Sequence, residues 1–389
     1  MQALAQDYVV VAESPDKERV FAGSPGLARL PGGELVASYE WFRAKPLTET
    51  VPRQTEVRVS GDGGATWELR GSTDIIWPST FAHGGALYMI GNRRQSREVV
   101  ISRSGDGGHT WTPEVTICER RSHGAPTAIT FRGRHVYRAF ETCPRTGRGG
   151  GGRSSWESFV MAGDLGRDLL DPAAWRASPQ ERFPGAPPGL NTRSYPPETG
   201  TEDCWIEGNI ISVQGQLRNL LRVHLNGRAT VGMAAICDLD DDGTTMHYRF
   251  SQFCPMLGGQ CKFHILHDEP SGLFWSAVNP VSDTWTPVQE ELRAIRFQGI
   301  PGNERRILML IYSTDAQNWF QAGCIAMSRR MLDAFSYASN LVDGDDLLVL
   351  SRTSVNAYNQ HNGNLITLHR VRNFRDLALD LSRDFSPSS

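Results

Sequence analysis

Short runs of alternating apolar and polar residues, separated by glycine-rich turns, extend along the whole chain. Alternation with a period of two residues is the pattern of a β-strand that buries one face. A unit of strand, tight turn and strand recurs six times, at residues 26–40, 79–91, 126–141, 209–223, 262–278 and 337–351. Further strands follow most units, so the pattern predicts an all-β fold of six four-stranded antiparallel sheets.

A second repeat marks the turns between outer strands. The motif Ser-Gly-Asp-Gly-Gly-x-Thr-Trp occurs at residues 60–67 and again at 104–111, each time after an alternating run. Glycine permits positive φ in a tight turn, aspartate bonds turn amides, and tryptophan packs the turn onto the next strand. Weaker copies surround Asp242 and Asp315. We interpret all four turns as structural, since turn chemistry alone explains their residues.

These turns resemble the Asp-boxes of the sialidase-like β-propellers, also called BNR repeats. The resemblance implies one propeller domain over residues 1–389, with six blades by hairpin count or seven if two units were merged. The last blade lacks an outer strand, and the N-terminal segment DYVVVAES can supply it. Such a closure would remove the exposed sheet edges of the ring.

Composition narrows the function. The 389 residues include 39 glycines and 22 prolines, which suits many turns, and 40 Lys and Arg stand against 43 Asp and Glu. A net charge of −3 argues against binding to nucleic acid, and no apolar run approaches the roughly 20 residues of a membrane span. The start MQALAQDYVVVAES has no signal-peptide pattern, so we expect a cytoplasmic protein or a trimmed secreted one, and a monomer.

Propeller topology nominates the candidate site. The starts of inner strands and the ends of second strands meet at one mouth of the ring, where ligands generally bind. The residues expected there for catalysis are His123, Tyr195, Tyr337 and His361. Those expected to bind substrate are Asn92, Arg93, Glu141, Glu207, Asn209, Arg222, Lys262 and Arg352. Hairpin counting places Arg222 beside Gly208 and Asn209, and Glu141 beside Ala125.

The predicted mouth is basic although the chain is slightly acidic. Arginine offers a bidentate fork for a carboxylate, so we expect an anionic oligo- or polysaccharide as partner. His123 heads an inner strand beside Gly124, and a histidine there suits proton transfer. By contrast, His83 lies in a turn at the opposite face and His109 within an Asp-box, so we expect both to be structural.

Seven cysteines, an odd number in a long chain, predict buried thiols and no disulfide framework. Cys254, Cys261, His264 and His267 have spacings that would suit a structural metal, but alternation on a strand turns the two histidines to opposite faces. No cofactor is therefore expected, with a metal near Cys254, Cys261 and His264 as the alternative.

Residues 206–223, 255–280 and 343–354 resemble propeller proteins related to ulvan lyases and rhamnosyl-glucuronate lyases. This resemblance implies β-elimination on a glucuronate-containing glycan, with His123 matching a proton-transfer histidine of the third blade. A second histidine of those lyases is replaced here by Glu141 or Cys143. The sialidase resemblance is weaker at the site: the first-blade arginine motif is absent, the acid aspartate is not evident, and Tyr337 alone could match the tyrosine nucleophile.

Two alternatives stay open beside the lyase. A sialidase-like glycoside hydrolase would need two carboxylates, for which Glu40, Glu141 and Glu207 are candidates. A non-catalytic glycan-binding propeller would use Trp41, Trp77 and Trp205 to stack sugars.

Overall fold

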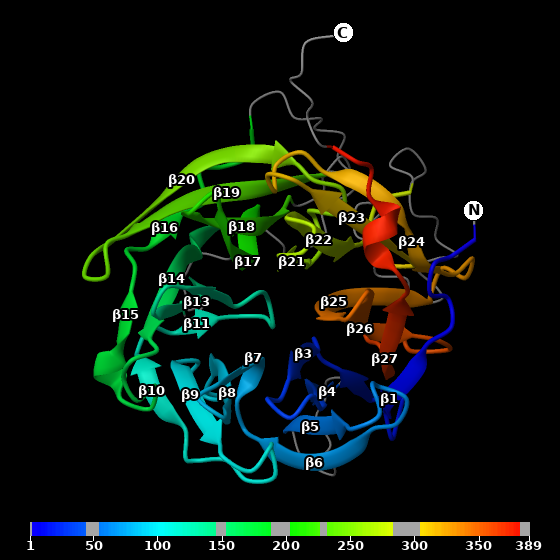
Figure 1. The fold of residues 1–389 in the computed structure, drawn as a ribbon, viewed down its shortest axis with the longest axis horizontal. Helices are drawn as coiled ribbons and strands as arrows, with labels where there is room; N and C mark the ends of the chain where they lie inside the picture. The colour runs from blue at the N-terminus through cyan, green and yellow to red at the C-terminus, as the bar shows by residue number, and fades with distance from the viewer. Residues whose placement is uncertain are drawn as a thin grey trace, which may run out of the picture.

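The computed structural model describes residues 2–43, 54–144, 153–187, 203–225, 232–282 and 304–381. Within these ranges, six antiparallel sheets stand in chain order around a common centre, as Figure 1 shows along the ring axis. The architecture is the predicted all-β, six-bladed propeller. In the described ranges, no helix is long and apolar enough to cross a membrane.

Each blade runs from an inner strand at the ring centre to an outer strand. Blade 1 consists of β2 (Val20–Ala22), β3 (Gly26–Arg29), β4 (Leu35–Arg43), β5 (Thr55–Ser60) and β6 (Glu68–Thr73). Blade 2 consists of β7 (Ile76–His83), β8 (Ala86–Asn92), β9 (Val99–Ser104) and β10 (Val115–Cys118). Blade 3 consists of β11 (Ser122–His123), β12 (Thr130–Arg132), β13 (His135–Thr142), β14 (Glu157–Asp164), β15 (Trp175–Ala177) and β16 (Glu181–Arg182).

The other three blades follow the same plan. Blade 4 consists of β17 (Cys204–Val213), β18 (Gln216–His224), β19 (Met233–Asp241) and β20 (Met246–Pro255). Blade 5 consists of β21 (His264–Asp268), β22 (Leu273–Val278), β23 (Ile307–Ser313) and β24 (Phe320–Met327). Blade 6 consists of β25 (Ala334–Asp343), β26 (Asp346–Ser354), β27 (Leu365–Val371) and β1 (Val9–Glu13). Among the described residues, 3₁₀ turns occur at Arg153–Ser155, Pro172–Ala174 and Phe374–Leu377.

The two ends of the chain meet in blade 6. Strand β1 pairs antiparallel with β27, with Val9 opposite Leu368 and Glu13 opposite Leu365, and Figure 1 shows the two side by side. Just before β1, the amides of Leu4 and Ala5 donate to carbonyls of β24 in blade 5. The N-terminal segment therefore ties blades 5 and 6 together and covers the edge that β27 would expose.

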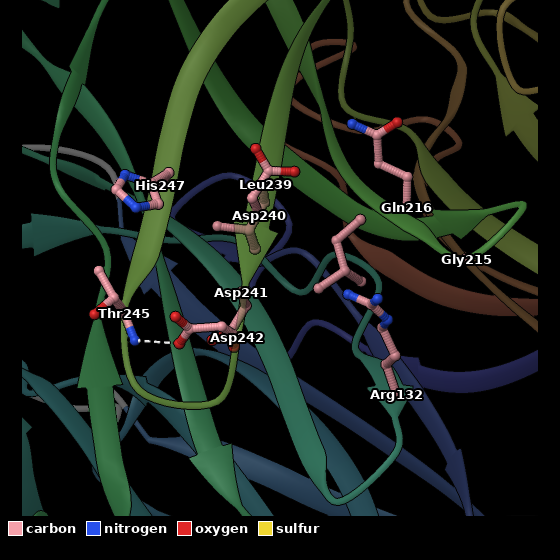
Figure 2. A pocket seen from close by; sticks show the side chains of 10 residues that line it. Arg132, Gly215, Gln216, Leu239, Asp240, Asp241, Asp242, Thr245 and His247 are labelled. Carbon is pink, nitrogen blue, oxygen red and sulfur yellow. Dashed lines mark hydrogen bonds between the residues drawn. The ribbon is translucent and has the colours of Figure 1, made fainter.

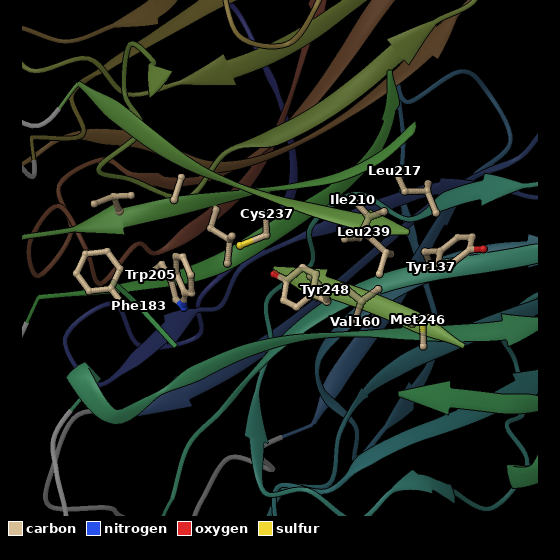
Figure 3. Packing of buried hydrophobic residues seen from close by; sticks show 14 of the residues in the cluster. Tyr137, Val160, Phe183, Trp205, Ile210, Leu217, Cys237, Leu239, Met246 and Tyr248 are labelled. Carbon is tan, nitrogen blue, oxygen red and sulfur yellow. The ribbon is translucent and has the colours of Figure 1, made fainter. Parts of the chain in front are cut away.

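Hydrophobic side chains fill the spaces between neighbouring sheets. Between blades 3 and 4, Val160, Trp205, Leu217 and Cys237 are fully or almost fully buried in one cluster, and Figure 3 shows them between the two sheets. Trp205 has no exposed surface, so it cannot be one of the sugar-stacking residues that the glycan-binding alternative suggested. Packing of this kind holds each blade on its neighbours without a continuous backbone ladder.

The Asp-box turns have the expected internal bonding. Asp62 accepts hydrogen bonds from the amide and hydroxyl of Thr66 and from the hydroxyl of Ser60, and the Trp67 indole donates to the Gly64 carbonyl. Asp106 repeats the aspartate contacts with Thr110 and Ser104. These bonds, above all those from Thr66, lower the pKa of the Asp62 carboxyl, although it is exposed.

We therefore expect Asp62→Ala to lower the melting temperature, since the turn loses three hydrogen bonds at once. A lowered carboxyl pKa adds stability above the ordinary aspartate value of about 3.9, and that contribution declines as the pH falls toward the folded-state pKa. Calorimetry at pH 7 and near pH 3 checks this, with the exposed turn residue Asp74→Ala as control. Equal melting temperatures for the Asp62 and Asp74 variants would contradict the structural role.

Candidate functional site

A cavity of about 360 Å³ opens at the mouth of the ring where the inner strands begin. Its lining comes from blades 1, 2, 3, 4 and 6 and from the loops that follow their second strands. The lining residues are Gly23, Ser24, Glu40, Trp41, Phe42, Ile76, Trp77, Arg94, Arg97, His123, Gly124, Ala125, Glu207, Tyr337, Arg352 and His361. Five of the predicted site residues line it, namely His123, Glu207, Tyr337, Arg352 and His361.

Three lining residues on inner strands share an unusual backbone conformation. Trp77, Glu207 and Tyr337 have φ angles of 52°, 60° and 56°, in the left-handed region that non-glycine residues seldom adopt. Each lies near the start of an inner strand, β7, β17 or β25, where the pairing with the second strand shifts register. Such a bulge turns a side chain away from the regular pleat. Here, blades 2, 4 and 6 each direct one large side chain into the cavity.

A buried side chain holds the carbonyl of each left-handed residue. Arg138 donates to the Trp77 carbonyl at 2.7 Å. Asn209 donates to the Glu207 carbonyl at 3.3 Å, and Lys262 donates to the Tyr337 carbonyl at the same distance. The three strained peptides are thus fixed from behind by groups that solvent does not reach.

This geometry changes the roles predicted for Asn209 and Lys262. Asn209 also accepts from the amides of Ala128 and Ile265, so it links blades 3, 4 and 5. Lys262 additionally donates to the Ala338 carbonyl, and burial lowers the pKa of its ammonium to about 7. Neither residue lines the cavity. Both act on the backbone behind the site, and the prediction of direct substrate contact is not supported by their positions.

Glu207 and Arg222 form a buried ion pair at the cavity wall. A guanidinium nitrogen of Arg222 lies 2.9 Å from a Glu207 oxygen, and its Nε donates to the Gln260 carbonyl at 2.6 Å. Burial alone would raise the pKa of Glu207, but Arg222, His123 and Lys262 outweigh it and lower the pKa. Glu207 is consequently an ionised carboxylate. Arg222 is already committed to it and does not line the cavity.

The register around Arg222 differs from the one expected. Arg222 lies opposite Ile206, because the bulge at Glu207 and Gly208 takes up the residues that hairpin counting had assigned to it. In blade 3, Glu141 lies opposite His123 and not opposite Ala125. Both errors arise because residues were paired across each hairpin one by one, as if the inner strands had no bulge or break.

Tyr337 lies among arginine side chains. The central guanidinium carbon of Arg352 is 3.7 Å from the centre of its ring, and that of Arg305 is 5.6 Å away. Burial alone would raise the pKa of the Tyr337 phenol, yet Arg305, Arg352 and Arg222 lower it below the ordinary value. The ring of His361 is 6.0 Å from the tyrosine ring, and burial lowers the pKa of this histidine far enough to keep it neutral.

Glu40 is a carboxyl group in a different electrostatic environment. It lies near the end of β4, beneath Gly23, where a β-carbon would collide with its side chain. Burial raises the pKa of Glu40, and this effect exceeds the opposing influence of Arg94 and Arg352. The cavity therefore holds one carboxyl that favours its protonated form, Glu40, and one that favours ionisation, Glu207.

His123 has a carboxylate partner behind it. Its Nδ1 lies 3.1 Å from one oxygen of the buried Glu141, whose other oxygen accepts a hydrogen bond from the Glu207 amide. The imidazole also contacts the rings of Trp77 and Trp156, with centroids 4.5 and 5.3 Å away. Glu141 thus positions both His123 and Glu207 without lining the cavity itself.

The remaining predicted residues lie elsewhere. Asn92 is fully buried and donates to the Arg97 carbonyl and to Ser122, which joins blades 2 and 3. Arg93 pairs with Glu98 and Glu114 beside a different hollow. Tyr195 lies outside the described residues. His83 contacts the Leu165 carbonyl at 3.2 Å, away from the mouth.

Sequence reasoning missed Arg97 and Arg305. Arg97 has a φ of 67° in the loop after β8, and its guanidinium lies 4.2 Å from the Trp77 ring centre. A left-handed arginine has no sequence signature, which explains the omission of Arg97. Arg305 lies just before β23, and hairpin counting selected only the starts of inner strands and the ends of second strands.

A second hollow of about 590 Å³ lies at the turns of blade 4, on the face opposite the mouth. Figure 2 shows that Asp242 accepts a hydrogen bond from the Thr245 amide. The neighbouring Asp241 pairs with Arg176. These groups already have partners within the fold. Across the described ranges, no three His, Cys, Asp or Glu side chains are placed to hold a metal ion.

Comparison with known proteins supports the fold. No protein-family model and no curated protein match the chain. Among solved structures, an α-L-arabinanase of Penicillium chrysogenum complexed with arabinobiose is 12% identical, with a TM-score of 0.54 over 95% of this chain and 98% of that one. The Trypanosoma rangeli sialidase in complex with sialic acid is 15% identical, with a TM-score of 0.55 over 96% of this chain and 60% of that one. A Dyadobacter fermentans protein of unknown function is 13% identical, with a TM-score of 0.57 over 95% and 98%.

These likenesses confirm that the chain has the β-propeller fold that the sialidase and the arabinanase also have, and at such identities they show the fold alone. The two enzymes named are not lyases, so the expected closeness to ulvan and rhamnosyl-glucuronate lyases gains no support from them.

The buried ion pair yields a stability prediction. Arg222→Met should lower the free energy of unfolding at pH 7 by about 3–5 kcal/mol, because it leaves Glu207 buried without its partner. The carboxyl pKa should then exceed its unfolded value, so the variant should regain stability as the pH falls through that pKa. Urea unfolding at several pH values measures both effects.

The double variant Arg222→Met/Glu207→Leu serves as the matched control, since it removes both charges. It should be more stable at pH 7 than Arg222→Met alone. If the single and double variants unfold at the same urea concentration, Glu207 does not depend on Arg222 for its charge.

Proposed function

We propose that the protein is a glycoside hydrolase that removes an acidic terminal sugar, with Tyr337 as nucleophile, Glu207 as its anionic partner and Glu40 as proton donor. The observation that carries the proposal is the environment of Tyr337. Its phenol faces the cavity, its pKa is lowered by surrounding arginines, and it interacts electrostatically with the buried Glu207 carboxylate. Tyrosine nucleophiles are the known exception to the two-carboxylate rule of glycosidases.

The first chemical step forms a bond between Tyr337 Oη and the anomeric carbon and breaks the bond to the leaving oxygen. Arg352 and Arg305 stabilise the phenolate, and the phenol proton passes to Glu207. Glu40 gives its proton to the departing oxygen, for which the raised pKa suits it.

The second step releases the sugar. Glu40, now ionised, removes a proton from a water molecule that attacks the anomeric carbon. The bond to Tyr337 breaks, and Glu207 returns its proton to the departing phenol oxygen. Two displacements at one carbon give net retention of configuration. NMR can detect retention from the anomeric configuration of the sugar that is released first.

Arg352 supports an acidic substrate. One of its guanidinium nitrogens donates to the Ala22 carbonyl at 3.2 Å, and the group also hydrogen-bonds the Tyr337 phenol. Its Nε has no hydrogen-bond partner among the described residues. A sugar carboxylate could accept from the remaining donors beside Tyr337. The solved enzymes of the same fold that are named above for arabinan and sialic acid agree with a carbohydrate substrate.

The activity is tested with 4-nitrophenyl glycosides of sialic, glucuronic and galacturonic acids, with a neutral arabinofuranoside for comparison. Tyr337→Phe should abolish detectable turnover while the melting curve stays near that of the wild type. Tyr88→Phe, at a buried tyrosine stacked on Phe81 in blade 2, is the control and should remain active. Full activity of Tyr337→Phe on any acidic glycoside would remove the tyrosine from the mechanism.

Glu40 should set the alkaline limb of the pH profile. Turnover requires the protonated acid, so it should fall as the pH rises through the raised pKa of Glu40. Glu40→Gln should remove this limb and cost on the order of 10²–10⁴ in kcat with poor leaving groups. The loss should be smaller with 4-nitrophenol, which departs without protonation. An alkaline limb that survives in Glu40→Gln would assign the proton transfer to another group.

A lyase is the second candidate function, on the strength of the His123 and Glu141 pair. In β-elimination, an arginine binds the uronate carboxylate and His123 removes the carbon-5 proton. The bond between carbon 4 and oxygen 4 then breaks, and the departing oxygen takes a proton from Tyr337. Products of a lyase absorb in the ultraviolet because a double bond conjugates with the carboxylate. Hydrolysis gives no such absorbance, and a binding module gives no product.

If elimination is the activity, His123→Ala should cost on the order of 10²–10⁴ in turnover on a uronate polysaccharide, with substrate affinity much less affected. His83→Ala, at the far face, is the matched control. The assay is ultraviolet absorbance over a panel of uronate polysaccharides. Unchanged absorbance in the His123 variant would exclude it as the proton-transfer residue.

A further inference from the structure

We propose that Arg97 and Trp77 form a second anion-binding subsite in the same cavity, which binds a carboxylate or sulfate on the sugar of the leaving group. The substrate would then carry acidic groups on both sides of the cleaved bond. Naming this the leaving-group side depends on the proposed function, whereas the presence of a second anion site does not.

The subsite is built from a stacked pair. The Arg97 guanidinium lies over the Trp77 ring, 4.2 Å from its centre, and both residues line the cavity. Toward the residues that the structure describes, this guanidinium donates no hydrogen bond. Stacking on an aromatic face leaves the edge of a guanidinium open for a planar oxyanion.

The backbone of Arg97 is fixed before any ligand binds. Its left-handed conformation is held by its amide, which donates to the Arg93 carbonyl at 3.0 Å. Its carbonyl accepts from Asn92 Nδ2 at 3.1 Å and from the Ser122 amide at 2.9 Å. A preorganised arginine loses little freedom on binding. The fixed backbone of Arg97 should therefore raise the affinity of this subsite for an anion.

The charge of Arg97 is poorly compensated. Burial and the neighbouring Arg121 and Arg94 lower its pKa, and the opposing influences come from Glu40 and Cys143. Glu40 itself favours protonation, so it offers little negative charge. An oxyanion at this point would relieve the repulsion among the arginines.

The position of Glu40 indicates which sugar lies here. Its carboxyl interacts electrostatically with Arg94, Arg352 and Arg97, which all line the same cavity. A proton donor must lie at the oxygen between the two sugars. With the acidic terminal sugar beside Tyr337 and Arg352, the next sugar therefore lies toward Arg97 and Trp77.

The experiment is a titration of the folded protein with free glucuronate and with glucose 6-sulfate, followed by calorimetry and by ligand-observed NMR. The wild type should show two classes of site for glucuronate. Arg97→Met should weaken one class at least tenfold, and Arg352→Met should weaken the other. Arg249→Met, which removes an exposed arginine of the outer strand β20, is the charge-matched control and should retain both.

Arg97→Lys guards against a general effect on folding, since it keeps the charge. It should weaken the same class by less than Arg97→Met does, with an unchanged melting curve. If the binding of glucose 6-sulfate depends on Arg97, sulfate is the preferred group. If only the binding of glucuronate depends on Arg97, carboxylate is the preferred group.

A single class of site that is unchanged in Arg97→Met would overturn the subsite, even if acidic glycosides are hydrolysed. Two classes with the stated dependence would establish it, even if no glycoside is hydrolysed. The two proposals can thus fail separately.

Discussion

Three residues in the left-handed backbone region determine where the reactive groups of this propeller lie. Trp77, Glu207 and Tyr337 each occupy a bulge near the start of an inner strand, and each side chain enters the cavity because of it. A strained residue of this kind costs on the order of 1–3 kcal/mol. Such a conformation persists only where the surroundings enforce it, and here Arg138 and Lys262 hold two of the carbonyls from behind.

The same buried groups set the protonation states at the mouth. Arg222 keeps Glu207 ionised, burial favours protonated Glu40, and the arginines around Tyr337 lower the pKa of its phenol. Two carboxyls with opposite protonation preferences beside a tyrosine of lowered pKa are the groups that the proposed hydrolase mechanism uses. A cavity built only to bind neutral sugars would have no need to separate these pKa values.

The sequence predicted the fold more completely than the site. Alternation, the six hairpins and the Asp-boxes are local signals, and they were sufficient for the six-bladed propeller. Topology also brought His123, Glu207, Tyr337 and Arg352 to one mouth. It misplaced Arg222 because the bulge at Glu207 and Gly208 leaves no trace in a hydrophobic pattern. For the same reason Asn209 was taken for a binding residue, although its side chain links three blades.

Trapping the covalent intermediate tests most directly whether Tyr337 is the nucleophile of a hydrolase. The protein would be incubated with a fluorinated glycosyl fluoride of an acidic sugar, which forms an intermediate quickly and releases it slowly, and then digested for mass spectrometry. A hydrolase with a tyrosine nucleophile should show the added sugar on the peptide that contains Tyr337. Labelling of a carboxyl side chain in its place, or an unlabelled protein that forms ultraviolet-absorbing products from uronate polysaccharides, would contradict the account.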